Sequence, residues 1–232
     1  IYVIRYQGFS WFNAPIILNY ACKSKELWGI PMPILIRGIA MEGSIGPVAG
    51  SSHNSIYYKM PGIKIISPMT PSEYRYSYKY FMKNDDVLYV SEHRGSYDNK
   101  EDLKDYLPKN CDLILFSISI TRFEALKVRN ILKKKGYNIG IANILWIKPF
   151  NIKKKWITVL KESKYGGIVL DDDYSKGVAS DIAYKLMKNS GSKIEIMGLK
   201  DKSAGFSKMT DNLPPNSKEI IKMILKIVKN TK

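Results

Sequence analysis

The stretch RGIAMEGSIGPVAGSSHNSIYYKMPGIKIISP, Arg37–Pro68, decides how the first half of the chain folds. An apolar run, Met32–Ile36, comes just before it, and a second apolar run, Ile63–Ser67, follows Met-Pro-Gly near its end. Short, continuously apolar runs are typical of strands buried on both faces of a parallel sheet. Between the two runs lies a loop of glycine and small residues that presents His53. We expect function to reside in this loop, since sites form where the strands of parallel sheets end.

The rest of the chain alternates between helical and strand-like patterns. The expected helices span residues 14–27, 71–83, 123–135, 153–162, 178–188 and 217–229, with a short one possible over 53–59. The other expected strands span residues 1–6, 87–91, 113–118, 138–145, 168–171 and 194–197. This alternation indicates βαβ units, and the aperiodic polar stretch 94–110 is expected to be a linker. The sequence therefore predicts an α/β protein of two domains, residues 1–105 and 106–232, with parallel or mostly parallel sheets.

The composition narrows the function classes. The net charge is +16, but the excess is mostly lysine spread along the whole chain, without aromatic residues interleaved in a basic stripe. We therefore expect no nucleic-acid partner. Apolar runs stay shorter than the ~18 residues that a membrane span needs, so we expect no membrane partner. Cys22 and Cys111 lack metal-type spacing, which favours free thiols, no metal site, and a location in the cytoplasm, or in an organellar matrix if the source is eukaryotic.

Two charged or titratable residues border the loop. His53 is one of two histidines, and an imidazole can exchange a proton near neutral pH and hydrogen-bond a carboxylate or alkoxide. The alternative is a loop histidine that caps a short helix. Arg37 could bind an anionic substrate at the mouth of the loop, or it could pair with Glu42 or cap a strand end. His93, the second histidine, is expected to be a polar residue beside the linker.

For the other polar or flexible positions, an ordinary structural role competes with a role in binding. Gly43, Gly46 and Gly50 could let a cofactor approach the backbone, but ordinary turns explain them as well. The run Asp171–Asp173 could suggest a metal site. Because three consecutive carboxylates do not share a face in a strand, a solvated turn or a helix N-cap is the expectation.

Several stretches of the chain resemble a known family. SSHNS and YYKMPGIKIISPMTPSEYRYSYKYFMKNDDVLYVSEH, within residues 51–93, are similar to the β-subunit of thiamine diphosphate-dependent 2-oxo acid dehydrogenases of the pyruvate and branched-chain type. CDLILFSISITRFEALKV, NIGIANILWIKPFN and VLDDDYSKGVASDIA resemble the transketolase C-terminal domain. The resemblance implies a partial pyrimidine-binding domain followed by a transketolase C-terminal-like domain.

The resemblance also implies site residues and a cofactor. His53 falls on the family's active-site histidine, and Phe9 falls on the aromatic residue that packs against the pyrimidine ring of thiamine diphosphate. Glu92 falls on a strand-end carboxylate whose function in the family is structural. The cofactor's Mg²⁺ would be held mainly by a partner α-subunit, because the diphosphate-binding signature is not found in this sequence. The family's catalytic glutamate is expected upstream of Ile1, since the chain begins abruptly with strand-like residues.

The implied activity is oxidative decarboxylation of a 2-oxo acid with acyl transfer to lipoamide. The implied partners are an α-subunit, a second copy of the chain and a lipoyl acyltransferase core. One alternative is a transketolase or 1-deoxyxylulose-5-phosphate synthase-like subunit, although such enzymes carry further basic or histidine ligands around the loop. The other alternative is a non-catalytic assembly subunit, which stays open because Asn143–Trp146 replaces the family's acid-Leu-Arg run.

Overall fold

A computed structural model describes residues 1–42, 52–203 and 212–230 of the chain. The chain divides into two compact units. The first comprises Ile1–Asp102, Leu145–Phe150 and Asp201–Leu213, and the second comprises Leu103–Ile144, Asn151–Lys200 and Pro214–Lys232. The sequence predicted a single boundary after residue 105, whereas the first unit also takes in segments from the second half of the chain.

The first unit is built on a five-stranded sheet in the order β1-β2-β4-β3-β7. Strands β1 to β4 pair in parallel, and β7 runs antiparallel to β3 at the edge. The strands are β1 (Tyr2–Ile4), β2 (Ile34–Ala40), β3 (Ile63–Ile66), β4 (Val87–His93) and β7 (Trp146–Lys148). The mostly parallel α/β architecture expected from the sequence is confirmed.

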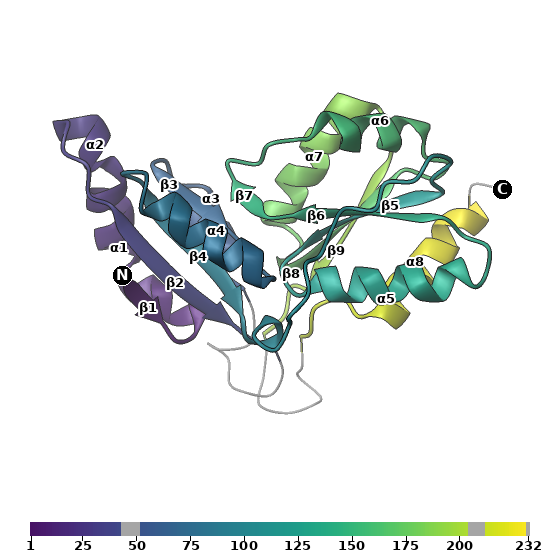
Figure 1. Ribbon diagram of the computed structural model, residues 1–232, viewed down its shortest axis with the longest axis horizontal. Coiled ribbons are helices and arrows are strands. Elements are labelled where there is room, and N and C mark those ends of the chain that lie inside the picture. The colour runs from purple at the N-terminus through teal and green to yellow at the C-terminus, as the bar shows by residue number, and fades with distance from the viewer. Residues whose placement is uncertain (43–51, 204–211, 231–232) are drawn as a thin grey trace. The chain divides into compact units, whose positions relative to one another are not determined.

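Alternation along β2 and β4 gives this sheet two different faces. Leu35, Leu88 and Val90 pack against α4 (Pro71–Phe81), which covers one face (Figure 1). On the other face, the Tyr57 ring of α3 (Asn54–Tyr58) stacks on Tyr89 with ring centroids 4.7 Å apart. The expected helix at 14–27 is a continuous helical run made of α1 (Ala14–Ile16), one π-helical turn (Ile17–Ala21) and α2 (Cys22–Trp28).

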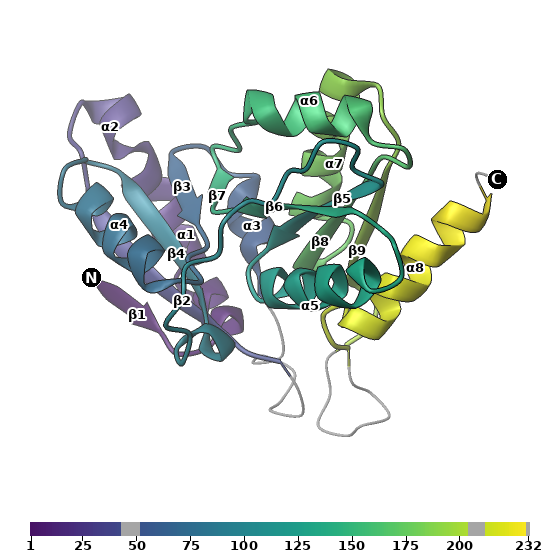
Figure 2. The same cartoon turned by 45° about the vertical axis from the view of Figure 1, so that its right-hand side comes forward.

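The second unit is a four-stranded parallel sheet in the order β6-β5-β8-β9. Its strands are β5 (Leu113–Ile118), β6 (Ile139–Ile144), β8 (Gly167–Tyr174) and β9 (Ile194–Leu199). Helices α5 (Thr121–Lys133) and α8 (Ser217–Asn230) bury their apolar faces on one side of it. Helices α6 (Lys154–Glu162) and α7 (Val178–Ser190) lie together on the other side (Figures 1 and 2).

One expectation about local structure was wrong, and two others hold with small differences. The acidic run Asp171–Asp173 is neither a solvated turn nor a helix cap, because β8 continues to Tyr174 and all three side chains are buried. The expected strand over 138–145 ends at Ile144, and a separate edge strand, β7, follows it. The expected linker is partly ordered, since the backbones of Tyr106 and Ile141 exchange two hydrogen bonds of 2.8 and 2.7 Å.

Burial affects the titration of one residue in the acidic run. It raises the pKa of Asp171 well above the ordinary value of an aspartate. The Ser119 hydroxyl donates to a carboxylate oxygen of Asp172 at 2.7 Å.

Within the part of the chain that the structure describes, no helix is both long and apolar enough to cross a bilayer.

Gly62, in the Met-Pro-Gly turn before β3, allows a close backbone approach. Its φ is +77°, and a Cβ built there would lie 1.9 Å from the carbonyl oxygen of Cys22 on α2. Gly29 has a similar φ of +71°, but a Cβ there would meet no atom within 4 Å. A substitution at Gly29 would therefore introduce backbone strain alone, whereas a substitution at Gly62 would add a steric clash.

We predict that Gly62→Ala destabilises the protein more than Gly29→Ala does. Gly29→Ala should cost about 1–2 kcal/mol, the penalty of a left-handed L-residue. Gly62→Ala should cost roughly a further 1–3 kcal/mol, because the new methyl displaces a helix carbonyl. Urea unfolding followed by circular dichroism measures both, and equal losses in the two variants would contradict the close packing at Gly62.

Candidate functional site

The candidate site lies at the carboxyl end of the first unit's parallel strands. β1 leads into η1 (Gln7–Phe12), a short 3-10 helix, and β2 leads through Met41 and Glu42 toward His53. Carboxyl ends of parallel strands share one edge of a sheet, which is where α/β proteins form their sites. Gly43, Gly46 and Gly50, considered above as a cofactor approach, lie outside the described residues.

The side chain of Gln7 is buried and connects three elements of this edge. Its amide nitrogen donates to the carbonyl oxygen of Gly38 in β2 at 3.1 Å and to the hydroxyl of Ser91 in β4 at 2.8 Å. Its amide oxygen accepts a hydrogen bond from the backbone N–H of His53 at 2.8 Å. Gln7 therefore fixes the backbone of His53 relative to the sheet.

His53 directly precedes α3, but its side chain does not cap that helix. Its imidazole meets the indole of Trp11 edge-on, with ring centroids 5.6 Å apart and an interplanar angle of 85°. Burial lowers the pKa of His53 from 6.5 to about 4, because desolvation disfavours the charged imidazolium. At neutral pH the ring is therefore uncharged and can both donate and accept a hydrogen bond.

The short helix η1 carries exposed aromatic residues, one of which contacts His53. Phe9 is 42% exposed, and its ring neighbours are Tyr6 and Phe12, at centroid distances of 6.1 and 6.5 Å. Trp11, 54% exposed, is the η1 aromatic residue that contacts His53. The sequence reasoning singled out Phe9 and missed Trp11. The aromatic density of the segment FSWF was the signal that could have indicated it.

Asn54 places an unsatisfied amide next to His53. Its side chain is 1% exposed, and neither Oδ1 nor Nδ2 has a hydrogen-bond partner among the described residues. An unpaired buried amide costs about 1–3 kcal/mol, so native proteins normally satisfy such groups with water, a ligand or a partner. The amide of Asn54 therefore leaves an NH2 group and a carbonyl oxygen without a partner among the described residues.

Arg37 is not brought together with His53. Its Nε and Nη2 atoms lie 2.5 and 2.8 Å from the two carboxylate oxygens of buried Glu92, which also accepts from the Tyr97 hydroxyl at 2.8 Å. This hydrogen-bonded pairing raises the pKa of Arg37 above its ordinary value. Arg37 thus pairs with Glu92 and not with Glu42. It shares the α4 face of the sheet with Val90, whereas Gly38 and Ser91, which hold Gln7, face the other way.

The Arg37–Glu92 pair forms part of a cavity of about 310 Å³ on the α4 face. The remaining lining residues are Pro71, Tyr74, Tyr78, Tyr97 and Asn99. The Tyr74 hydroxyl is 3.0 Å from the Ser96 hydroxyl, and its ring lies 6.4 Å from that of Tyr97. Tyr97, in the segment after β4, therefore contacts both the charged pair and Tyr74 of α4.

His93 is buried at the end of β4 and is not a solvated residue beside a linker. Its Nδ1 accepts from the Gly95 N–H at 3.0 Å, which leaves the proton on Nε2, 2.5 Å from a carboxylate oxygen of Glu42. Burial alone would raise the pKa of Glu42, but the hydrogen bond from His93 outweighs it and lowers this pKa. His93 therefore holds the segment that leaves β2.

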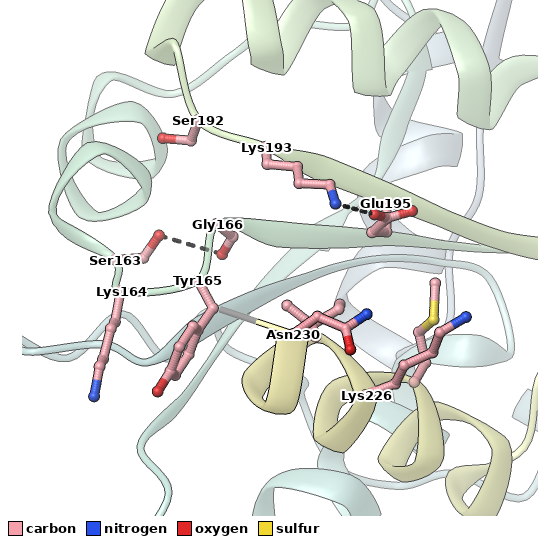
Figure 3. A pocket seen from close by; sticks show the side chains of 11 residues that line it. Ser163, Lys164, Tyr165, Gly166, Ser192, Lys193, Glu195, Lys226 and Asn230 are labelled. Carbon is pink, nitrogen blue, oxygen red and sulfur yellow. Dashed lines mark hydrogen bonds and ion pairs between the residues drawn. The ribbon is translucent and has the colours of Figure 1, made fainter. Parts of the chain in front are cut away.

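A second cavity, of about 480 Å³, lies in the second unit beside the start of β8, the start of β9 and the end of α8 (Figure 3). Lys164, Lys193 and Lys226 contribute to its lining, and the Lys193 ammonium lies 3.0 Å from the Glu195 carboxylate. It faces the amino ends of the strands, the edge opposite to that used by sites in parallel sheets. Among the described residues, no group of three or more His, Cys, Asp or Glu could hold a metal ion.

We predict that stability falls on acidification through the titration of His53. In the unfolded chain His53 binds a proton near its ordinary pKa of 6.5, whereas in the fold this requires a pH near 4. Between these values the unfolded state binds more protons, so stability decreases as the pH falls. The urea midpoint should drop more from pH 7 to pH 5 in the wild type than in His53→Gln. Equal drops would show that His53 is not desolvated in the fold.

Comparisons with known proteins agree with this architecture. Residues 105–220 match the family model described as "Transketolase, C-terminal domain". The chain is 28% identical over 149 residues to "Pyruvate dehydrogenase E1 component subunit beta" of Chaetosphaeridium globosum, covering 57% of this chain and 44% of that protein. It is 22% identical over 171 residues to the protein of the same name in Mesostigma viride, covering 67% of this chain and 51% of that protein.

Two further similarities extend the picture. The chain is 24% identical over 139 residues to "Pyruvate dehydrogenase E1 component subunit beta-3, chloroplastic" of Arabidopsis thaliana, covering 52% of this chain and 33% of that protein. A solved structure named "Split gene transketolase, inactive beta4 tetramer" superposes with a TM-score of 0.72 and 14% identity, over 98% of this chain and 75% of that chain. This last similarity concerns the fold alone.

The chain spans about half or less of the length of these curated relatives, between 33% and 51%. The family match, in contrast, covers half of the 232 residues. The relatives agree with a β-subunit of the transketolase superfamily. The chain therefore belongs to the transketolase C-terminal domain family.

Proposed function

We propose that the chain acts as the β-subunit of a thiamine diphosphate-dependent 2-oxo acid dehydrogenase. Together with an α-subunit it would decarboxylate a 2-oxo acid oxidatively and transfer the acyl group to lipoamide. The observation that carries this proposal is His53, an uncharged imidazole held at the carboxyl edge of the sheet by Gln7 and Trp11. The names of the curated relatives support the choice of reaction class.

The residues around His53 fit part of a thiamine diphosphate site. Phe9 and Trp11 expose aromatic rings that can pack against a planar heterocycle, and Phe9 is the residue proposed to contact the pyrimidine ring. The unsatisfied amide of Asn54 offers a donor and an acceptor to polar atoms of such a ring. When bound, the cofactor supplies the electron sink that allows the substrate carboxylate to leave as carbon dioxide.

The diphosphate and its Mg²⁺ are assigned to the α-subunit. Among the described residues, no group of His, Cys, Asp or Glu suits a metal ion. Mg²⁺ prefers carboxylates and substrate phosphates as ligands, and the part of this chain described around His53 supplies aromatic and amide groups instead. In this proposal the first unit therefore contributes the pyrimidine side of a composite pocket.

His53 would move a proton and stabilise charge at the substrate. The desolvated imidazole is neutral before substrate arrives, so it can donate its N–H to an oxygen on which negative charge develops. A nearby anion raises the pKa of a histidine, so the same ring becomes a better proton acceptor once substrate is bound. Arg37 is not assigned to the substrate, because its guanidinium pairs with Glu92 on the opposite face.

The proposed partners follow from the assignment as a β-subunit of a 2-oxo acid dehydrogenase. They are an α-subunit, a second copy of the chain and a lipoyl acyltransferase core. The curated relatives are named as subunits of an E1 component, and the superposed structure is named as a tetramer, which supports association. We place the protein in the cytoplasm or an organellar matrix, and the chloroplastic relative supports the second option.

We predict that thiamine diphosphate binds only when the chain is mixed with its α-subunit. Isothermal titration calorimetry of the chain alone, the α-subunit alone and the mixture measures this directly. In the mixture, His53→Ala should retain binding but lower the decarboxylation rate by roughly 10²–10⁴-fold, the usual value of a positioned acid or base. Lys226→Ala, on the exposed face of α8, should leave the rate unchanged.

Each other outcome contradicts part of the proposal. Absence of binding in the mixture would exclude the cofactor assignment. Binding without turnover of any 2-oxo acid would indicate a non-catalytic assembly subunit, and turnover of sugar phosphates instead would indicate a transketolase-like subunit. A normal rate in His53→Ala would remove the role given to that residue.

A further inference from the structure

We propose that Gln7 is a positioning residue for His53, holding the histidine backbone at the carboxyl edge of the sheet. The catalytic consequence rests on the proposed function, whereas the positioning itself does not. Gln7 is 1% exposed, so its polar amide is committed to neighbours in the protein. Both of its polar atoms are used, the nitrogen by Gly38 and Ser91 and the oxygen by His53.

The chemistry of these three contacts requires a glutamine. Two of the partners, a carbonyl oxygen and a hydroxyl, accept hydrogen bonds from Gln7, and the third, a backbone N–H, donates to it. A carboxylate has no hydrogen to donate, an ammonium has no acceptor, and an aliphatic side chain has neither. Asparagine carries the same amide but is one methylene shorter. The identity of residue 7 is therefore set by the pattern of donors and acceptors around it.

The backbone of β2 is accessible at the point where Gln7 binds. A Cβ at Gly38 would lie 2.1 Å from the hydroxyl oxygen of Tyr89, so a larger residue would displace that ring. Tyr89 in turn stacks on Tyr57 of α3, the helix that directly follows His53. The glycine thus lets the Gln7 amide and the Tyr89 ring approach the same point of β2.

The short helix η1 contacts both the backbone and the side chain of His53. Gln7 and Trp11 belong to η1, and they contact the backbone N–H and the imidazole of His53 respectively. η1 is joined to the sheet through the Gln7 bonds to β2 and β4. Loss of the Gln7 amide would remove the bond to the His53 backbone and would loosen η1, together with Trp11, from the sheet. A displacement of about 1 Å at a catalytic group can cost roughly 10²-fold in rate.

The test uses the nuclear magnetic resonance signals of the two histidines in the chain. His53→Ala assigns the His53 signal, and His93, bound to Glu42 and Gly95, serves as an internal reference. Gln7→Leu should move the His53 signal and raise its titration midpoint toward the unperturbed value of about 6.5, because the ring becomes more hydrated. The His93 signal should stay in place. No cofactor or partner is needed for this measurement.

Two serine variants distinguish a specific effect of Gln7 on His53 from a general loss of stability. Ser91→Ala removes the hydroxyl that accepts from Gln7 and should shift the His53 signal in the same direction by a smaller amount. Ser24→Ala removes another buried hydroxyl, one that donates to the Ile30 carbonyl, and should leave the His53 signal unchanged. If Gln7→Leu does not fold, the comparison between the two serine variants decides the question.

The outcomes distinguish this proposal from the proposed function. An unshifted His53 signal in folded Gln7→Leu, or equal shifts in Ser91→Ala and Ser24→Ala, would overturn the positioning role even if the enzyme assignment holds. In the mixture with the α-subunit, Gln7→Leu should lower kcat by roughly 10–10²-fold with cofactor affinity unchanged. Shifted signals without any decarboxylation would leave the positioning intact and overturn the proposed function.

Discussion

The parallel pairing of β2 with β4 determines which face of the sheet each side chain of these two strands occupies. Seven residue pairs, from Ile34 with Val87 to Ala40 with His93, fix the register. Because side chains alternate along a strand, this register sends Arg37 and Glu92 to one face and the partners of Gln7 to the other. A shift by one residue would exchange the two sets. The charged pair and the histidine site are therefore kept apart by strand geometry.

This separation gives the two faces different electrostatic properties. On the α4 face, the buried carboxylate of Glu92 is neutralised by Arg37 and hydrogen-bonded by Tyr97. On the other face, His53 lies among aromatic and amide groups, and desolvation keeps it uncharged. An uncharged base in a desolvated setting responds strongly to an arriving anion, since electrostatic interactions strengthen as water is excluded. In the proposed function, this arrangement suits chemistry in which negative charge develops close to His53.

Much of the fold could be predicted from the sequence, because apolar runs and helical periodicity are local signals. They located β2, β3 and most helices, and the glycine-rich loop singled out His53. The contacts of Gln7 could not be predicted, because a glutamine in a short turn has no periodic pattern. Its bond to His53 joins residues 46 positions apart, and the Arg37–Glu92 bond spans 55 positions. Such contacts exist only once the strands have paired.

At the acidic run, the local sequence pattern led to a wrong prediction. Asp171–Asp173 was expected to form a solvated turn or a helix N-cap, because three consecutive carboxylates do not share a face in a strand. Pairing of Tyr174 with Leu199 extends β8 through the run, so tertiary structure overrides the local preference.

The central claim is that the edge formed by Gln7, Trp11 and His53 receives the ring of thiamine diphosphate. Tryptophan fluorescence during cofactor titration of the mixture with the α-subunit tests it most directly, because Trp11 contacts His53. We predict a saturable quenching in the wild type that is lost in Trp11→Phe while calorimetry still detects cofactor binding. Quenching of equal size in Trp11→Phe, or binding without any change in wild-type emission, would contradict the account.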